Sequence, residues 1–218
     1  MAKLNAKQIP IDYMPTNGEV DKYLHQWDSL ENYVNQEKAL DKLFFHLCKT
    51  NVDLSDILIK CSALNDFYST NIFDVHSVAK HILGIHQIDE RLLHGDLSLI
   101  DEISHVEVGK DKKEHCFYSF ASKYCSHHQP LKYAIFDNYV EKVLVYFRKR
   151  DHFFEFQNGE LRCYPLFISI VKEFQKYYGL DDYNLKQIDK YLWQLGVTTQ
   201  SFSKMRIALT MGIAHSDC

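Results

Sequence analysis

The chain has 218 residues and a formal net charge of −4, and 46% of its residues are hydrophobic, with 14 phenylalanines and 14 tyrosines. This composition excludes a disordered chain, which would carry too few aromatic side chains to build a core, and it suits one large domain or two small lobes. No apolar run is long enough for a membrane span or a secretory signal, and the six cysteines are scattered, so we expect free thiols in a cytoplasmic protein.

Turn residues are scarce, with only eight glycines and four prolines, and this scarcity favours helices over strands. Apolar residues also recur at helical spacing in much of the chain. In the first half we expect helices over residues 20–48, 51–65, 75–83, 88–93 and 96–103. The polar stretch that follows, residues 105–114, predicts a loop.

The helical pattern continues in the second half of the chain. Residues 116–127 and 137–150 predict two helices, joined by a connector over residues 129–136 that contains Pro130. Residues 151–164 predict a loop, and two more helices over residues 165–178 and 182–195 are expected to end at Gly179 and Gly196. Residues 1–218 are therefore expected to form a single all-α domain, either undivided or with two lobes around a cleft.

Positive charge gathers in one part of this acidic chain. Residues 109–150 hold nine Lys or Arg and four Asp or Glu, a local charge of +5, whereas the remainder carries −9. His127 and His128 add possible positive charge in the same stretch. A local basic face can hold a phosphate backbone even on an acidic protein, although a solvated Lys/Arg surface explains the same composition.

Three segments of this stretch occur in a recognisable order. Residues 97–104 (LSLIDEIS) and residues 117–128 (FYSFASKYCSHH) form a helix pair, and residues 134–137 (AIFD) end the connector with an aspartate. This order resembles that of the helix-hairpin-helix DNA glycosylases, with the helix-hairpin-helix-like segment at about residues 97–128. The resemblance implies a two-lobed helical fold that binds double-stranded DNA and excises a modified or damaged base without a cofactor.

A second patch, residues 67–72 (FYSTNI), resembles the glycosylase segment that carries an Asn or Gln. In that superfamily the side chain fills the hole left by the flipped base, and the match gives this role to Asn71. A structural role for Asn71 as a helix cap or turn residue is the alternative. These patches, together with YLWQLG at residues 191–196, also look like a set of bacterial proteins that share them.

The chain departs from the family pattern in two places. The hairpin of the family carries Gly-x-Gly, whose free amides bind a phosphate, and this chain offers only Gly109. Lys123 also precedes Asp137 by 14 residues, about one helical turn fewer than the family pattern. Either the helix is one turn shorter here, or Ser119 occupies the place of the catalytic lysine and Lys123 lies elsewhere.

The resemblance assigns catalytic roles to Asp137 and Lys123. Breaking an N-glycosidic bond builds positive charge on the sugar, which the carboxylate of Asp137 would stabilise. The amine of Lys123 would attack the sugar carbon if burial lowered its pKa. The structural alternatives are a helix N-cap for Asp137 and a surface position for Lys123, in which case Asp137 would activate water and the enzyme would be monofunctional.

Further residues are expected to bind DNA or the base. The DNA-binding set comprises Asn71, Gly109, Lys110, Lys112, Lys113, His127 and His128, and the base pocket includes Tyr118 and Tyr124. The alternative for the two tyrosines is a place in the core. Cys116, Cys125, His127 and His128 do not have the paired spacing of a zinc site, so we expect no metal.

Three functions are consistent with these patterns. The first is a DNA N-glycosylase, with lyase activity as well if Lys123 is active. The second is a DNA-binding protein on the same helical scaffold without catalysis, which the missing Gly-x-Gly favours. The third is a helical interaction module with no nucleic-acid role, in which the aromatic residues serve packing alone.

Overall fold

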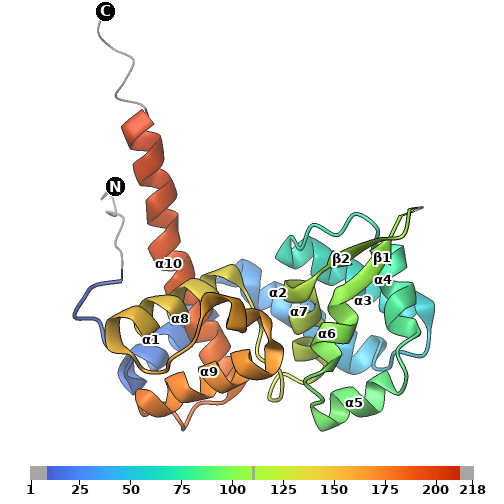
Figure 1. Ribbon diagram of the computed structural model, residues 1–218, viewed down its shortest axis with the longest axis horizontal. Coiled ribbons are helices and arrows are strands. Elements are labelled where there is room, and N and C mark those ends of the chain that lie inside the picture. The colour runs from blue at the N-terminus through green and yellow to red at the C-terminus, as the bar shows by residue number, and fades with distance from the viewer. Residues whose placement is uncertain (1–8, 110, 212–218) are drawn as a thin grey trace, which may run out of the picture.

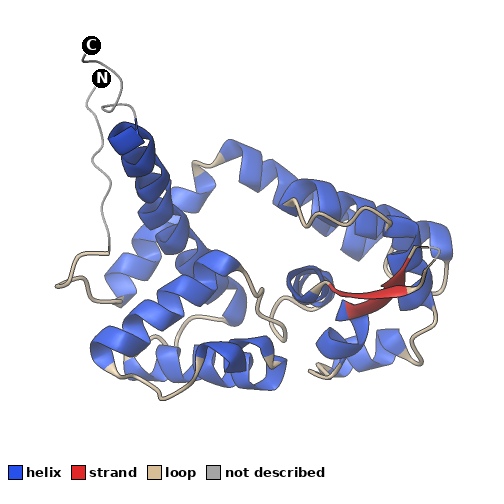
Figure 2. Ribbon diagram, turned by 45° about the horizontal axis from the view of Figure 1, so that its top comes forward, coloured by secondary structure: helices blue, strands red, loops and turns tan. Residues whose placement is uncertain are grey.

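A computed structural model describes residues 9–109 and 111–211, and the side chains within them up to residue 198. Helices dominate, and the sheet of the described residues is a single two-stranded hairpin (Figure 2). The prediction of an all-α protein is therefore confirmed. The chain forms two lobes that lie side by side (Figure 1).

The first lobe is built from the middle of the chain and the second from both ends (Figure 1). The first lobe contains the π-helix η1 (Leu43–Leu47), α3 (Leu54–Tyr68), α4 (Val75–Leu83), α5 (Ile88–His94), α6 (Leu99–Ser104), β1 (His105–Val108), β2 (Lys113–Cys116) and α7 (Tyr118–His128). The second contains α1 (Asn17–Asp28), α8 (Asn138–Asp151), the 3₁₀ helix η2 (Asn158–Arg162), α9 (Tyr164–Tyr177) and α10 (Leu185–Met211). The helix α2 (Glu31–Lys42) leads from the second lobe to the first, and residues 129–137, the connector, lead back.

Side-chain caps fix where several of these helices begin. Asp53, Asp74 and Asp137 each accept a hydrogen bond from a backbone N–H in the first turn of α3, α4 and α8, respectively. Such caps satisfy amide groups that have no partner within the helix. The N-cap predicted for Asp137 is thus confirmed, and it sets the place where the connector ends.

The segment predicted as a loop over residues 105–114 is instead a β-hairpin. Strands β1 and β2 pair antiparallel, with Val106 opposite His115, and Val106 is buried. Gly109 and Lys112, both with positive φ, allow the turn between the strands. Strand β1 has a single buried residue among its four and all four residues of β2 are exposed, so no two-residue period of apolar side chains marks the strands in the sequence.

The stop predicted at Gly196 is also wrong, because α10 continues through this glycine to Met211. A glycine inside a helix costs only about 1 kcal/mol, which packing can outweigh. Here the packing is very close. A Cβ atom on Gly196 would lie 2.7 Å from Cβ and 2.9 Å from the carbonyl oxygen of Tyr139, in the first turn of α8. Gly196 therefore lets α10 touch the backbone of α8 directly after Asp137.

Helix α7 is the central helix of the first lobe. Ten of its eleven residues are buried, including the polar side chains of Ser122, Lys123, Ser126, His127 and His128. Buried polar groups are costly unless they are hydrogen-bonded, so a helix of this kind indicates a polar site rather than ordinary packing.

Gly196→Ala is expected to destabilise the protein by about 1–3 kcal/mol, because the new methyl group meets backbone atoms of Tyr139 that cannot rotate away. Chemical denaturation measures the change. The matched control is Gly159→Ala, whose added methyl group meets no atom within 4 Å. Equal stability of the two variants would contradict the close approach of α8 and α10.

Candidate active site

Lys123 is buried where the two lobes meet. Only 2% of its surface is exposed, and its Nζ donates to the Oγ of Ser119 at 2.6 Å. The carbonyl oxygen of Phe136 lies 3.5 Å from the same nitrogen, and Oδ2 of Asp137 lies 3.8 Å away. Burial lowers the pKa of the Lys123 ammonium, and the carboxylates of Asp137 and Asp189 only partly oppose that effect. A lysine in this environment is closer to its nucleophilic, neutral form than a surface lysine.

The two carboxylate oxygens of Asp137 have different partners. Oδ1 accepts the backbone N–H of Tyr139 at 2.7 Å, which caps α8, while Oδ2 faces Lys123. The cap therefore fixes the orientation of the carboxylate toward the lysine. The functional and structural interpretations of Asp137 are compatible in this geometry.

Two serines of α7 attach the end of the connector to the helix that carries Lys123. Ser122 Oγ accepts the N–H of Phe136 at 3.0 Å, and Ser119 Oγ donates to the carbonyl of Phe136 at 3.1 Å. The residue before Asp137 is thus held directly against α7. The Lys123 ammonium reaches back one turn to the Ser119 hydroxyl, so both residues lie at this site.

Two cavities meet at this pair. The aromatic cavity, of about 380 Å³, has walls formed by Trp27, Tyr33, Phe67, Tyr68, Tyr139 and Trp193. The groove cavity, of about 710 Å³, is lined by Asn71, Tyr118, Ser119, Asn138 and Arg162, among others. Lys123, Asp137, Tyr68 and Ser69 line both cavities and so form their shared wall.

The aromatic cavity draws its walls from segments that are far apart in the sequence. The rings of Tyr33 and Trp193 lie 4.9 Å apart between centroids, and those of Trp27 and Trp193 lie 5.8 Å apart. Glu37 accepts from Trp27 Nε1 at 3.1 Å and pairs with Lys186 and Lys190 at 2.8 Å each. A cavity lined mainly by aromatic rings, with a few charged side chains in fixed positions, has the composition of a small-molecule pocket.

Asp189 is a second carboxyl in the aromatic cavity and does not line the groove cavity. Its Oδ2 accepts the backbone N–H of Ile135 at 2.6 Å, which ties α10 to the connector. Burial raises the pKa of Asp189 to about 8, although this hydrogen bond and the nearby Lys123 ammonium both lower it. Asp189 is therefore largely protonated at neutral pH.

Tyr68 forms the other side of the shared wall. Its hydroxyl lies 2.9 Å from Nε2 of His127, with which it shares a hydrogen bond, and the Lys123 ammonium lies 5.2 Å from its ring centroid. Burial lowers the pKa of His127 to about 3, so this imidazole is neutral. Tyr68 thus contributes a ring face to the lysine while its polar end is held in the interior.

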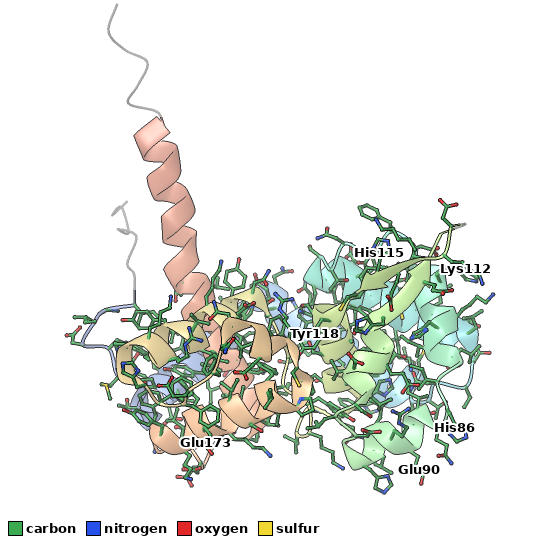
Figure 3. All side chains as sticks on the ribbon, in the orientation of Figure 1. His86, Glu90, Lys112, His115, Tyr118 and Glu173 are labelled. Carbon is green, nitrogen blue, oxygen red and sulfur yellow. The ribbon has the colours of Figure 1, made fainter. Side chains whose placement is uncertain are left out.

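Several predicted site residues lie together. Asn71, Lys123 and Asp137 all line the groove cavity, as does Tyr118, which lies at the junction of the lobes in Figure 3. Tyr124 does not line either cavity. It is fully buried and donates to Asn51 in a core cluster with Lys60, so its placement in a base pocket is corrected.

His127 and His128 are not on the basic surface where the sequence placed them. Both are buried, His127 against Tyr68 and His128 beside Lys60 and Asn51. Burial lowers the pKa of each imidazole, so neither adds positive charge at neutral pH. Their expected contact with DNA phosphates is corrected for this reason.

The hairpin residues lie away from the lysine site. Gly109, Lys112 and Lys113 are exposed, and Lys112 lies at the outer end of the hairpin in Figure 3. Lys110 lies outside the described residues. The structure therefore joins α6 and α7 through a protruding ribbon and not through a tight glycine hairpin.

Sequence reasoning missed most of the residues that line the two cavities. Tyr68, Arg162, Asp189 and Trp193 line the cavities but were not singled out. One signal was present, because Asp189 and Trp193 stand four residues apart on a helix and so share a face. In the described parts of the chain, no group of three or more His, Cys, Asp or Glu side chains is placed to hold a metal ion.

The fold and site define a two-lobed helical protein with a buried lysine and a carboxylate where the lobes meet. The family model described as the HI_0787 N-terminal domain matches residues 19–132, and the chain belongs to this family. A protein of Haemophilus influenzae, described as uncharacterized, is 44% identical over 167 residues, which cover 77% of this chain and 75% of that protein. No solved structure is significantly similar to the chain. Among the described helices, none has the length and apolar character needed to cross a bilayer.

The contribution of Asp189 to stability is expected to fall as the pH rises from about 4 to about 8, since folding raises the pKa of Asp189 from 3.8 to about 8, whereas the lowered pKa values of the buried His127 and His128 act in the opposite direction below about pH 6.5. In that window the folded state holds a proton that the unfolded state has lost, at a cost of up to about 1.4 kcal/mol per pH unit. Asp189→Asn keeps an oxygen for the Ile135 N–H and cannot ionise. Urea denaturation at pH 5 and pH 8 should show that the change in the free energy of unfolding between the two pH values is less favourable in the wild type than in Asp189→Asn, and an equal change in the two proteins would contradict the raised pKa.

Proposed function

We propose that this protein is a DNA N-glycosylase that excises a modified or damaged base from duplex DNA, with Lys123 and Asp137 as its catalytic residues. This role places the protein in the cytoplasm with the chromosome. The proposal extends the resemblance of residues 97–137 to the helix-hairpin-helix glycosylases.

The observation that carries the proposal is the shared wall between the two cavities. An enzyme that acts on a base must take the nucleotide out of the stack, and the bond to be broken joins base to sugar. A base in the aromatic cavity and a sugar-phosphate in the groove cavity would place that bond beside Lys123 and Asp137. The aromatic cavity lies within the size range of ligand pockets.

The chemistry follows from the environments of the two residues. The neutral amine of Lys123 attacks C1′ as the N-glycosidic bond breaks, and the bonding electrons leave with the base. The carboxylate of Asp137 stabilises the positive charge that develops on the sugar. The Lys123 nitrogen, now bonded to C1′, releases a proton, and O4′ accepts a proton as the C1′–O4′ bond opens. The nitrogen lone pair forms the C=N bond, which gives a protonated imine between Lys123 and the opened sugar, the state that leads to strand cleavage.

Burial of Lys123 argues against the two alternatives without catalysis. A DNA-binding surface needs exposed lysines, and an interaction module gains nothing from a desolvated ammonium group, which costs stability. The position of Lys123 is understandable if its function requires a neutral amine. In this proposal the DNA binds in the groove cavity. Asn71 fills the position that the flipped base leaves in the duplex, and Arg162 lines the same cavity from the second lobe.

Asp137→Asn should lower base excision at least about 100-fold, because the neutral amide cannot stabilise a positive charge on the sugar. The amide oxygen can still cap α8, so the fold should persist. The measurement is abasic-site formation in duplexes carrying oxidised, deaminated, alkylated or otherwise modified bases. Glu173→Gln, on the outer side of the second lobe (Figure 3), is the control and should match the wild type. Absence of any abasic product with the wild type across this panel would refute the proposed function.

Lys123→Met should abolish covalent trapping of the protein on an abasic duplex by borohydride, since no amine is left to form the imine. Its thermal stability should equal or exceed that of the wild type, because a desolvated charge is replaced by an apolar chain. The control, Lys172→Met on the exposed face of α9, should trap normally. A Lys123→Met variant that traps as well as the wild type would exclude Lys123 as the nucleophile, and a large loss of stability would indicate a structural lysine.

A further inference from the structure

The aromatic cavity holds a polar group for which the proposed reaction has so far no use. Asp189 lines this cavity and is absent from the groove cavity, whereas Asp137 lines both. A base in the aromatic cavity would therefore face Asp189, and the sugar would face Asp137. Asp189 is therefore placed to act on the base, and Asp137 is placed to act on the sugar.

One carboxyl oxygen of Asp189 is held by a hydrogen bond, and the other is accessible from the aromatic cavity. Oδ2 accepts the Ile135 N–H at 2.6 Å, so the carboxyl group cannot swing away from the connector. Within the described residues, no buried side-chain oxygen lacks a hydrogen-bond partner. No second partner of Asp189 is found there, so its other oxygen is reached from the cavity.

Burial favours the protonated form of Asp189, although the neighbouring ammonium groups of Lys123 and Lys186 oppose it. The charged side chains around it are Lys123 from α7, Asp137 at the start of α8, Glu37 from α2, and Lys186 and Lys190 from its own helix. The titratable neutral side chains are His127 and the tyrosines Tyr33, Tyr68 and Tyr139 on the cavity wall, and Tyr164 from α9. Glu37 is already paired with both Lys186 and Lys190. Burial dominates and raises the pKa of Asp189 to about 8, so the group carries a proton at neutral pH.

We propose that Asp189 is the acid that protonates the departing base, and that the substrate is a neutral modified base and not a positively charged alkylated one. This inference rests on the proposed function. As the N-glycosidic bond breaks, its electron pair goes to the base, and the proton passes from the Asp189 carboxyl to a nitrogen or oxygen of that base. Asp189 is left as a carboxylate and regains its proton from water.

The preference for a neutral base follows from the chemistry and from the charge of the cavity. A base that already carries a positive charge leaves without protonation, so an acid in its pocket is of no use to it. With Asp189 protonated and Lys123 as a neutral amine, the cavity walls present two ammonium groups, Lys186 and Lys190, against the two carboxylates of Glu37 and Asp137, so they hold no net negative charge that would attract a cation. The face of Trp27 is also occupied, because the Lys190 ammonium lies 4.7 Å from its centroid.

The test separates base release from chemistry at the sugar. Asp189→Asn should slow excision from duplexes carrying uracil, hypoxanthine or an oxidised guanine at least about 100-fold. Borohydride trapping on a pre-formed abasic duplex has no departing base, so it should fall less than about threefold. Asp189→Glu should recover part of the excision rate, and Asp181→Asn, an exposed aspartate just before α10, is the matched control.

The pH profile gives a second measurement. Wild-type excision should decline above about pH 8 as Asp189 loses its proton, and Asp189→Asn should lack this alkaline limb. Equal loss of excision and trapping in Asp189→Asn would reduce Asp189 to a structural residue and overturn the proposal. So would wild-type excision of N7-methylguanine alone. A wild type that neither excises nor traps would refute the proposed function, and this proposal with it.

Discussion

One ammonium group is buried between the lobes, and much of the surrounding structure is arranged to hold it there. Moving the Lys123 charge out of water costs several kcal/mol unless polar groups replace the lost water. Three separate segments supply them: Ser119 on α7, the Phe136 carbonyl on the connector, and the Tyr68 ring at the end of α3. The lobes are thus linked at a point where a shift of either one would leave a charge without partners.

Around that point the structure divides its acids between two environments. Asp137 keeps one oxygen on the cap of α8 and the other toward Lys123, while Asp189 is partly buried in the wall of the aromatic cavity, and its raised pKa favours the protonated form. Such a difference between two nearby carboxyl groups is how one site holds an acid and an anion at the same pH. The Ile135 N–H couples them, because the connector that it belongs to ends at Asp137.

The sequence predicted what depends on local pattern. It identified most of the helices, the cap at Asp137, and the order of segments that brings Asn71, Lys123 and Asp137 to one groove. It could not predict the aromatic cavity, whose rings come from α1, α2, α3, α8 and α10 and meet only after folding. Nor could it predict that Asp189 is enclosed, or that His127 and His128 are buried, because residue type does not reveal burial. The β-hairpin was not predicted because each of its strands has only four residues.

The hydrogen bond from Lys123 to Ser119 also bears on how distant relatives are recognised. A lysine side chain spans about one turn of a helix, so its amine can occupy the space above the residue four positions earlier. The position of Lys123 along the helix and the position of its amine in space therefore differ by about one turn. Families that have lost detectable similarity to one another are better sought by the location of the reactive atom than by the column of the residue that carries it.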